Sequence, residues 1–221
     1  QKSARESHQT ICSTPKGYLK TLLKLRERLV DTRMRLKVPL GEDSLFKDKS
    51  IVQQQRKHVT PILKSLSREI KEIEEKIVQL LKSDESLNNQ YELVSSVKGV
   101  GLIVGANFLV VSNEFTGITD PRKMACHCGL APFKTQSGKS VRSRNKVSHR
   151  ANKRMKTLLN LAARSAVGSK GELRDYYLRK VAEGKNKMLV MNAVRNKIVH
   201  RVYACVRDNR KYENFYTNAL A

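Results

Sequence analysis

A 3.5-residue repeat of apolar side chains is the sequence feature that most limits the folds open to this chain. Such spacing places apolar side chains in one stripe along a helix, and Glu and Lys flank the stripe here. The stripe predicts a coiled-coil seam, formed either between copies of the chain or as an antiparallel hairpin with a helix expected over residues 16–37. It runs without interruption for about three heptads, through Val59, Leu63, Leu66, Ile70, Ile73, Ile77 and Leu80.

Prolines and glycines set the expected limits of these helices. Pro39 and Gly41 are expected to end the helix over residues 16–37, because neither residue favours a helix interior. Thr60–Pro61 allows two interpretations. It can form an N-cap followed by the first helical residue, or Pro61 can kink a helix that begins near Asp48.

The composition favours a mainly all-α protein. Of 221 residues, 39% are hydrophobic and only 5% aromatic, which indicates helices packed through aliphatic side chains. A break at Ser83–Asp84 separates a helical or coiled-coil segment, 1–83, from a C-terminal domain, 84–221. No apolar run approaches the roughly 20 residues of a membrane-spanning helix. The polar start at Gln1, without Met, predicts no signal peptide and suggests part of a longer protein.

The cysteines predict neither a disulfide scaffold nor a metal site. In Cys126-His127-Cys128 the spacing is Cys-x-Cys, and no second pair of ligands has the spacing of a zinc site. Cysteine is often a small buried apolar residue, so reduced thiols in a cytoplasmic bacterial protein are expected. The four cysteines are Cys12, Cys126, Cys128 and Cys205.

A strongly basic stretch covers residues 121–171. It contains 13 Lys or Arg and no Asp or Glu, within a chain of formal net charge +24. Like charges this dense repel one another, so the stretch needs an external polyanion, and nucleic acid is the usual one. A merely solvated basic face is the alternative. The expected phosphate contacts are Lys134, Lys146, Arg150, Lys153 and Arg154.

A glycine-rich turn precedes the basic stretch. Helices are expected over 85–97 and 102–111, joined by Lys98-Gly99-Val100-Gly101. Two short helices around Gly-x-Gly are typical of a helix-hairpin-helix, here over 87–111, in which glycines let backbone amides approach a phosphate. Lys98, Gly99 and Gly101 are therefore candidate contacts to nucleic acid. The alternative is an ordinary tight corner between helices.

The basic stretch itself contains two expected helices and a connection. Thr119-Asp120-Pro121 is expected to start a helix that Gly129 ends. Residues 133–147 predict a loop or a small β-hairpin turning at Ser137–Gly138. Ser148 is expected to cap a helix from His149 to about Val167. The apolar face of this helix should be Met155, Leu158, Leu159, Ala162, Ala163 and Ala166, and helices over 172–182 and 186–207 should follow.

Several of these motifs, in this order, resemble a known protein family. The resemblance is to the C-terminal transposase domain of the bacterial insertion-sequence family one hundred and ten, whose recombinases are guided by a bridge RNA. It covers about residues 93–210, and a preceding coiled coil is typical of the family. The motifs that carry it are Val97-Lys98-Gly99-Val100-Gly101, Phe115, Cys128-Gly129-Leu130-Ala131-Pro132, Gln136-Ser137-Gly138 and Arg150-Ala151-Asn152-Lys153-Arg154-Met155.

The resemblance implies a serine nucleophile at Ser137, which would attack a scissile DNA phosphate and form a covalent phosphoserine. Cations at Lys139, Arg142 and Arg144 would stabilise the charge that develops on that phosphate. The chemistry of the residues alone does not separate Ser137 from Ser140 or Ser143. Family members also carry an N-terminal RNase-H-like domain whose acidic residues bind magnesium. No counterpart of that domain is found in this sequence, so no metal is expected to bind this fragment.

Three hypotheses follow. The first is an enzyme: the catalytic and self-associating half of a DNA transposase, inactive alone, with DNA, a guide RNA and a second copy as partners. The second is a helix-hairpin-helix module that binds nucleic acid without chemistry. The third is a coiled-coil scaffold whose charge gives solubility, and it predicts no salt-dependent binding of nucleic acid.

Overall fold

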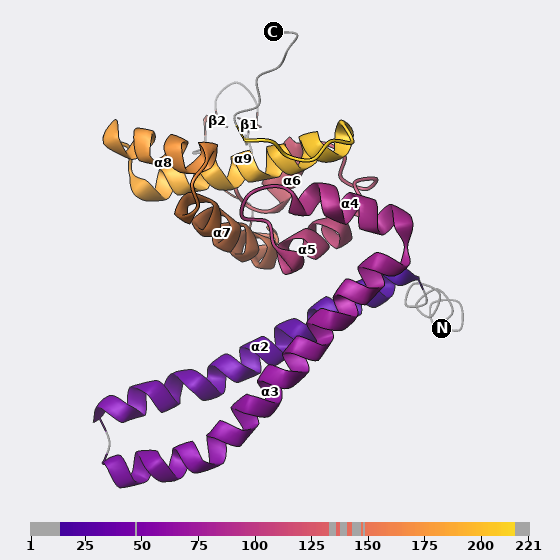
Figure 1. The fold of residues 1–221 in the computed structure, drawn as a ribbon. Helices are drawn as coiled ribbons and strands as arrows, with labels where there is room; N and C mark the ends of the chain where they lie inside the picture. The colour runs from indigo at the N-terminus through magenta and orange to yellow at the C-terminus, as the bar shows by residue number, and fades with distance from the viewer. Residues whose placement is uncertain are drawn as a thin grey trace. The chain divides into compact units, whose positions relative to one another are not determined.

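The computed structural model describes residues 14–46, 48–132, 136–137, 141–142, 147 and 149–214, with the backbone alone for 43–46, 136–137 and 141–142. This part of the chain is mainly helical, which confirms the expected class (Figure 1). It divides into two compact units with a boundary between Asp84 and Glu85. Within these residues, none of the helices combines the length and the apolar character needed to cross a membrane.

The first unit is an antiparallel hairpin of two long helices, α2 (Pro15–Phe46) and α3 (Lys49–Ser83) (Figure 1). The Arg26 guanidinium donates to Glu74 Oε1 at 2.6 Å, and Arg33 Nη1 donates to Ser67 Oγ at 3.4 Å. Residue numbers rise along α2 while those of their partners fall along α3, so the two helices are antiparallel. The hairpin interpretation of the seam is the one observed within the chain, and self-association stays a prediction.

The seam is buried in its middle, at Ile70, Ile73 and Ile77. Its other positions, Val59, Leu63, Leu66 and Leu80, remain partly accessible. Pro61 lies among these partly accessible positions, between Val59 and Leu63. On α2 the buried apolar side chains include Leu19, Leu22 and Leu23.

The expected end of the first helix at Pro39 and Gly41 is wrong, because α2 continues through both residues to Phe46. Likewise α3 begins after Asp48 and contains Pro61, as in the second interpretation of Thr60–Pro61. Six residues separate Arg33 from Pro39 and Ser67 from Pro61, so the two prolines lie at one level of the hairpin. Each proline removes one backbone hydrogen bond. Pairing with the neighbouring helix offsets that loss.

In the described part of the second unit, α9 (Lys187–Arg207) is central and contacts α4, α6, α7 and α8. Helix α5 lies against α4 and α7. The core between them is aliphatic, with Phe108 and Tyr203 as its large aromatic members. The other elements are α4 (Glu85–Ser95), α5 (Leu102–Ser112), α6 (Pro121–His127), β1 (Gln136–Ser137), β2 (Val141–Arg142), α7 (Lys153–Gly168) and α8 (Glu172–Ala182) (Figure 1).

Helix α7 begins four residues later than expected. Its cap is Asn152, whose side chain accepts a hydrogen bond from Met155 N at 2.9 Å, and not Ser148. Asn152 N–H also donates to His127 O at 2.8 Å, which fixes the chain outside the helix until this point. The expected apolar face is confirmed, since all six predicted residues of α7 are buried.

The connection from α5 to α6 contains three successive residues in the left-handed region, Asn113, Glu114 and Phe115, with φ of 56°, 55° and 60°. Residues other than glycine rarely adopt this conformation. The buried Ser112 hydroxyl supports it, because Oγ donates to Phe108 O at 2.7 Å and accepts from Phe115 N at 3.0 Å. The Phe115 ring then packs edge-on against Tyr203, with ring centres 5.0 Å apart.

Candidate nucleic-acid interface

The end of α6 and the start of α7 are held together at the two points where the chain leaves for β1 and returns from β2. This packed region around His127, Gly129 and Asn152 is called the base of the β1–β2 hairpin. The bond from Asn152 N–H to His127 O joins the two helix ends directly. At Gly129, with φ of 66°, an added Cβ would lie 2.8 Å from Ala151 Cβ and 3.2 Å from Val147 Cγ1. Glycine is therefore required both by the backbone and by the close approach of the returning chain. The segments that precede β1 and follow β2 therefore meet in one tightly packed base.

Helix α9 contributes a third attachment to this base. Asn192 Nδ2 donates to Leu130 O at 3.0 Å, at the point where the chain leaves α6 for the hairpin. The side chain of Asp120 caps the other end of α6, accepting from Arg122 N at 2.8 Å. Helix α9 therefore positions Leu130, from which the chain continues toward β1.

Ser137, the predicted nucleophile, is the last residue of β1. Its backbone pairs with Val141, and Gln136 pairs with Arg142 in an antiparallel register. Of the two structures expected for 133–147, the strands form the β-hairpin. Ser137 is paired in the ladder, and Gly138, the other residue of the expected turn, lies outside the described residues.

Many predicted site residues lie outside the part of the chain that the structure describes in full. For Ser137 and Arg142 the backbone alone is described. The residues outside the described ranges are Lys134, Lys139, Ser140, Ser143, Arg144, Lys146 and Ser148. The fully described candidates form two groups, one at the start of α7 and one against its second half.

The first group surrounds the start of α7. Arg150 and Lys153 are exposed, and Arg154 is half-buried on the first turn. The adjoining α6 adds Arg122 and Lys123, both exposed and not anticipated as site residues. Cations at a helix N-terminus oppose the helix dipole, so the arrangement does not favour the stability of the free chain. It suits an anion that approaches this end of α7.

The second group is the turn of Lys98, Gly99 and Gly101. Gly99 has φ of 89°, and an added Cβ would lie 2.2 Å from the carbonyl oxygen of Ala162 on α7. Packing alone therefore requires glycine at 99, which favours the tight-corner alternative for this residue. Gly101 is exposed at the start of α5, with no heavy atom within 4 Å of an added Cβ, so its backbone is open to a ligand.

Gly99 packs against Ala162 in the second half of α7, and the side chain of Lys98 reaches the far end of that helix. Lys98 Nζ donates to Lys170 O at 3.3 Å, just beyond the end of α7, whereas Lys153 is the first residue of that helix. At 1.5 Å per residue, α7 places Lys170 and Lys153 roughly 25 Å apart. The structure therefore does not bring all the predicted contacts into one compact site.

The cysteines of the Cys-x-Cys motif have different surroundings. Cys128 is fully buried, and burial raises the pKa of its thiol to about 12. Cys126 is partly exposed. Among the residues that the structure describes, no three His, Cys, Asp or Glu side chains gather as ligands for a metal ion.

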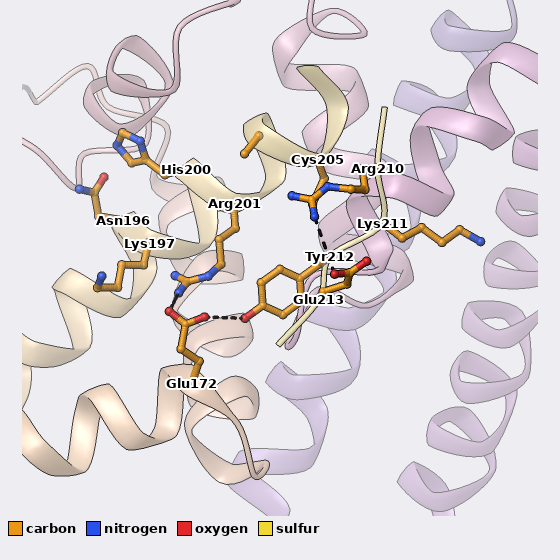
Figure 2. Close-up of a pocket in the computed structure, with 11 residues that line it drawn as sticks. Glu172, Asn196, Lys197, His200, Arg201, Cys205, Arg210, Lys211, Tyr212 and Glu213 are labelled. Carbon is orange, nitrogen blue, oxygen red and sulfur yellow. Dashed lines mark hydrogen bonds and ion pairs between the residues drawn. The ribbon is translucent and has the colours of Figure 1, made fainter. Parts of the chain in front are cut away.

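A pocket of about 570 Å³ lies between α8, α9 and the segment 210–213 (Figure 2), and no sequence signal indicated it. Glu172 accepts from Arg201 and, at 3.2 Å, from the Tyr212 hydroxyl. Burial lowers the pKa of Lys197, with Arg201 the next cause. The carboxylate that could attract a cationic ligand is thus already paired with residues of the pocket.

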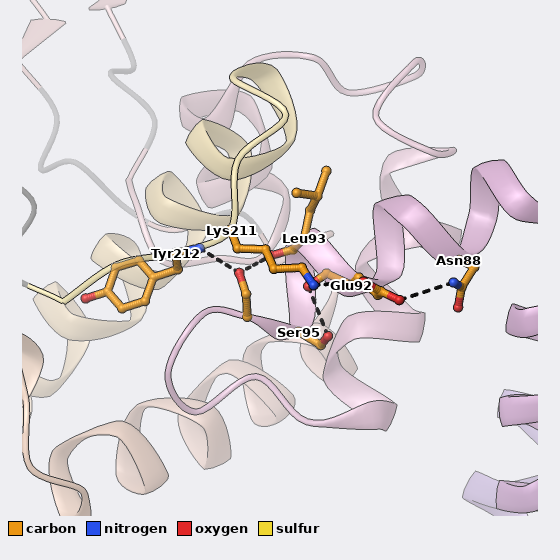
Figure 3. Close-up of polar contacts among 7 residues, drawn as sticks. Asn88, Glu92, Leu93, Ser95, Lys211 and Tyr212 are labelled. Atoms are coloured by element: carbon orange, nitrogen blue, oxygen red, sulfur yellow. Dashed lines mark hydrogen bonds and ion pairs between the residues drawn. The ribbon is translucent and has the colours of Figure 1, made fainter.

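The same C-terminal segment is attached to α4 (Figure 3). Lys211 Nζ lies 2.9 Å from Glu92 Oε2, and Tyr212 N donates to Ser96 Oγ at 2.8 Å. The hydrogen bond from Lys211 is the main reason that the pKa of Glu92 is lowered. These contacts join residues more than 100 positions apart, which is why periodicity and local motifs could not reveal them.

Comparison with known proteins gives the family context of these elements. Residues 91–178 match the family model described as Transposase IS116/IS110/IS902 family. That range begins in α4 and includes the Gly99 turn, the hairpin and the whole of α7. The expected likeness to insertion-sequence transposases is therefore confirmed at the level of this domain.

Three relatives are similar over longer ranges. An uncharacterized 44.8 kDa protein of insertion element IS116 from Streptomyces clavuligerus is 29% identical over 150 residues, which is 68% of this chain and 36% of that protein. A pilin gene-inverting protein of Moraxella lacunata is 25% identical over 148 residues, 66% of this chain and 46% of that protein. An uncharacterized 43.6 kDa protein of insertion element IS110 from Streptomyces coelicolor is 26% identical over 122 residues, 55% of this chain and 30% of that protein.

The chain thus spans less than half the length of these relatives. Across residues 91–178, it carries a region that matches the transposases of the IS116, IS110 and IS902 family.

Proposed function

We propose that this chain is the C-terminal part of a DNA transposase or recombinase, which binds DNA and a guide RNA and supplies a serine nucleophile. The observation that carries the proposal is the match over residues 91–178, which includes the Gly99 turn, the β1–β2 hairpin and α7 as one continuous region. The name of the Moraxella relatives, pilin gene-inverting protein, describes a DNA rearrangement and supports the same class of reaction.

Binding would rest on phosphate contacts. The 13 cations of 121–171 have no acidic neighbour in that stretch, so phosphates would be their counter-charges. The ammonium group of Lys98 and the start of α7 are separated by about the length of seven base pairs, at roughly 3.4 Å per pair. One duplex lying along α7 would therefore be long enough to contact both. Base specificity would come from pairing with the guide RNA.

The proposed chemistry is a transesterification at Ser137. The Ser137 hydroxyl attacks a backbone phosphorus, an Oγ–P bond forms, and one bridging P–O bond breaks. The serine proton passes to a base, and the released sugar hydroxyl takes up a proton. A sugar hydroxyl of another strand later attacks the phosphoserine, reversing these steps and rejoining the DNA. The nearby cations, including Arg142, would stabilise the charge on the phosphorane.

The basic stretch offers no carboxylate ligand for magnesium beside Ser137. The donors that magnesium prefers are carboxylates and other oxygens, and residues 121–171 contain no Asp or Glu. Any magnesium and the general base would come from the RNase-H-like domain that the family resemblance implies.

The first experiment measures binding by the chain itself. We expect the logarithm of the affinity for a 20-base-pair duplex to fall with the logarithm of salt concentration, with a slope of about −4 to −6. An affinity that does not change from low to moderate salt would contradict phosphate binding and favour the scaffold hypothesis. A structured RNA is measured in parallel, and competition between the two shows whether they share the surface.

The second experiment tests the chemistry in a protein of the relatives' full length that contains this sequence, supplied with magnesium and guide RNA. Labelled DNA should form a covalent adduct seen on denaturing gels, and Ser137→Ala should abolish it while changing affinity only a few-fold. Arg142→Ala should weaken both binding and adduct formation. Ser140→Ala and Ser143→Ala are matched controls that should retain the adduct. An adduct that persists in Ser137→Ala assigns the nucleophile elsewhere, and binding without any adduct leaves the non-catalytic module.

A further inference from the structure

Arg195 on α9 is a buried arginine for which the described part of the chain shows no counter-charge. Its exposed fraction is 7%, and its Nε has no hydrogen-bond partner among the residues that the structure describes. Burial is the one cause that lowers its pKa, and no carboxylate raises it. Buried arginines are normally paired, because desolvating a charge is costly. Arg195 is therefore unusual, because it is buried and its Nε–H has no partner among the described residues.

The sequence around Arg195 offers no acid to pair with it. Helix α9 contains no Asp or Glu from Lys187 to Arg207, and residues 121–171, which include α6, the hairpin and α7, contain none either. The acids on the other neighbours of α9 include Glu92 and Glu172, which are held by Lys211 and Arg201. No carboxylate contributes to the pKa of Arg195, so a bound anion would supply the counter-charge that its described neighbours do not.

Arg195 lies on α9 about one turn after Asn192, whose side chain contacts Leu130 at the base of the β1–β2 hairpin. Asn192, three residues earlier and on the same helical face, donates to Leu130 O, where the chain leaves α6 for the hairpin. Side chains on a helix lean toward the preceding turn, so the Arg195 side chain leans toward Asn192 and the Leu130 segment. Ser137 follows Leu130 by seven residues.

We propose that Arg195 binds a backbone phosphate of the DNA that the hairpin engages, and that this phosphate is its missing counter-charge. The inference rests on the proposed function, since it takes nucleic acid as the ligand. A guanidinium can offer paired N–H donors to one phosphate, and a site excluded from water strengthens that contact. The unpaired guanidinium of Arg195 would lower the stability of the chain without ligand and would gain its partner when the phosphate binds.

The test combines stability and binding in Arg195→Met, which keeps an unbranched apolar stem and removes the guanidinium. We expect the melting temperature of the free chain to stay the same or rise, because a buried unpaired charge is removed. Affinity for the 20-base-pair duplex should fall about tenfold, and the salt slope should lose about one unit. Lys187→Met, at an exposed position of α9 outside the basic stretch, is the matched control and should lower affinity less than threefold.

A second measurement works on the unmodified protein, so it does not depend on the variant folding. The Nε–H signal of Arg195 is followed by NMR, while duplex DNA or inorganic pyrophosphate is added at constant ionic strength. A shift with both probes supports the proposal. An unmoved signal with saturating duplex overturns it, as does Arg195→Met that binds like the unmodified chain. A chain that fails to bind duplex, but whose Arg195 signal shifts with pyrophosphate, keeps an anion site and rejects the proposed function instead.

Discussion

Gly99 lies directly against the carbonyl oxygen of Ala162, with room for a hydrogen atom and for no carbon. An added Cβ would lie 2.2 Å from that oxygen and 3.0 Å from Ala166 Cβ, and the backbone φ is 89°. The Lys98–Gly101 turn is therefore part of the packing of α7 as well as a candidate contact to nucleic acid. This double position makes glycine substitutions a direct way to separate folding from binding.

Gly99→Ala should lower the free energy of unfolding by roughly 2–4 kcal/mol, because it combines a left-handed backbone with a collision against α7. Gly184→Ala is the matched control, with φ of 80° and no atom within 4 Å of the added Cβ. It should cost about 1–2 kcal/mol from the backbone alone. Urea denaturation followed by circular dichroism measures both. Equal losses in the two variants would show that α7 moves away from the turn.

Gly101→Ala should leave folding nearly intact, because nothing lies within 4 Å of the added Cβ and φ is −93°. The expected change is below about 1 kcal/mol, the loss of a fair N-cap residue. If the amides at the start of α5 approach a phosphate, duplex affinity should fall about fivefold, roughly the size of one weakened neutral hydrogen bond. Unchanged affinity in a titration at fixed salt would identify the turn as a structural corner.

Ile70→Asp combined with Ile77→Asp should unfold the α2–α3 hairpin. Ile70 is 5% exposed and Ile77 is fully buried, so two charges would enter an apolar seam at a cost above about 4 kcal/mol. Ile62→Asp, at a position 49% exposed on the same helix, should cost less than about 0.5 kcal/mol. Helicity at 222 nm and urea denaturation report the loss.

Light scattering on the same proteins tests self-association. A dimer through the seam should become monomeric in the double variant, and a dimer through the exposed face of α3 should respond to Ile62→Asp. A chain that is monomeric before and after mutation leaves the intramolecular hairpin as the whole role of the heptad repeat.

Cys128 should resist alkylation in the native protein, whereas Cys126 should react. With a pKa of about 12, Cys128 is a thiolate in roughly one molecule in 10⁴ at pH 8. In Cys126→Ser the peptide containing Cys128 should stay unlabelled by iodoacetamide until the protein is unfolded, as measured by mass spectrometry. Rapid labelling of the native variant would mean that the core around α6 opens.

The raised pKa of Cys128 also sets a direction for alkaline stability. Its ordinary value is 9.0, so above about pH 9 the unfolded chain loses a proton that the native chain keeps until about pH 12. Raising the pH through this window therefore favours unfolding. Cys128→Ala should flatten the fall in unfolding free energy between pH 9 and 11, measured by urea denaturation.

Elements with strong local signals could be predicted from the sequence. The six apolar residues of α7 repeat with helical spacing, and all are buried. Helices α8 and α9 begin where expected, after Gly171 and after Asn186, whose side chain accepts from Met188 N. In these cases the local preference and the tertiary structure agree, so the sequence of the segment alone is enough to predict where the helix lies.

The elements that could not be predicted depend on distant partners. Asn152 rather than Ser148 caps α7 because His127 O fixes the chain just before it. Pro39 stays inside a helix because α3 lies alongside. The contact of Tyr212 with Glu172 joins separate segments, and a burial such as that of Arg195 cannot be read from a helix of mixed polarity.

The base of the β1–β2 hairpin has a consequence for how this region can change. Because His127 O accepts from Asn152 N–H and Leu130 O accepts from Asn192 Nδ2, both ends of the interval between α6 and α7 are fixed by contacts of their own. The entropic cost of closing a loop rises only slowly with its length, so residues inserted between these fixed ends should change the free energy of unfolding little. Insertions there would change what the chain presents at this end of α7 while α6 and α7 keep their packing.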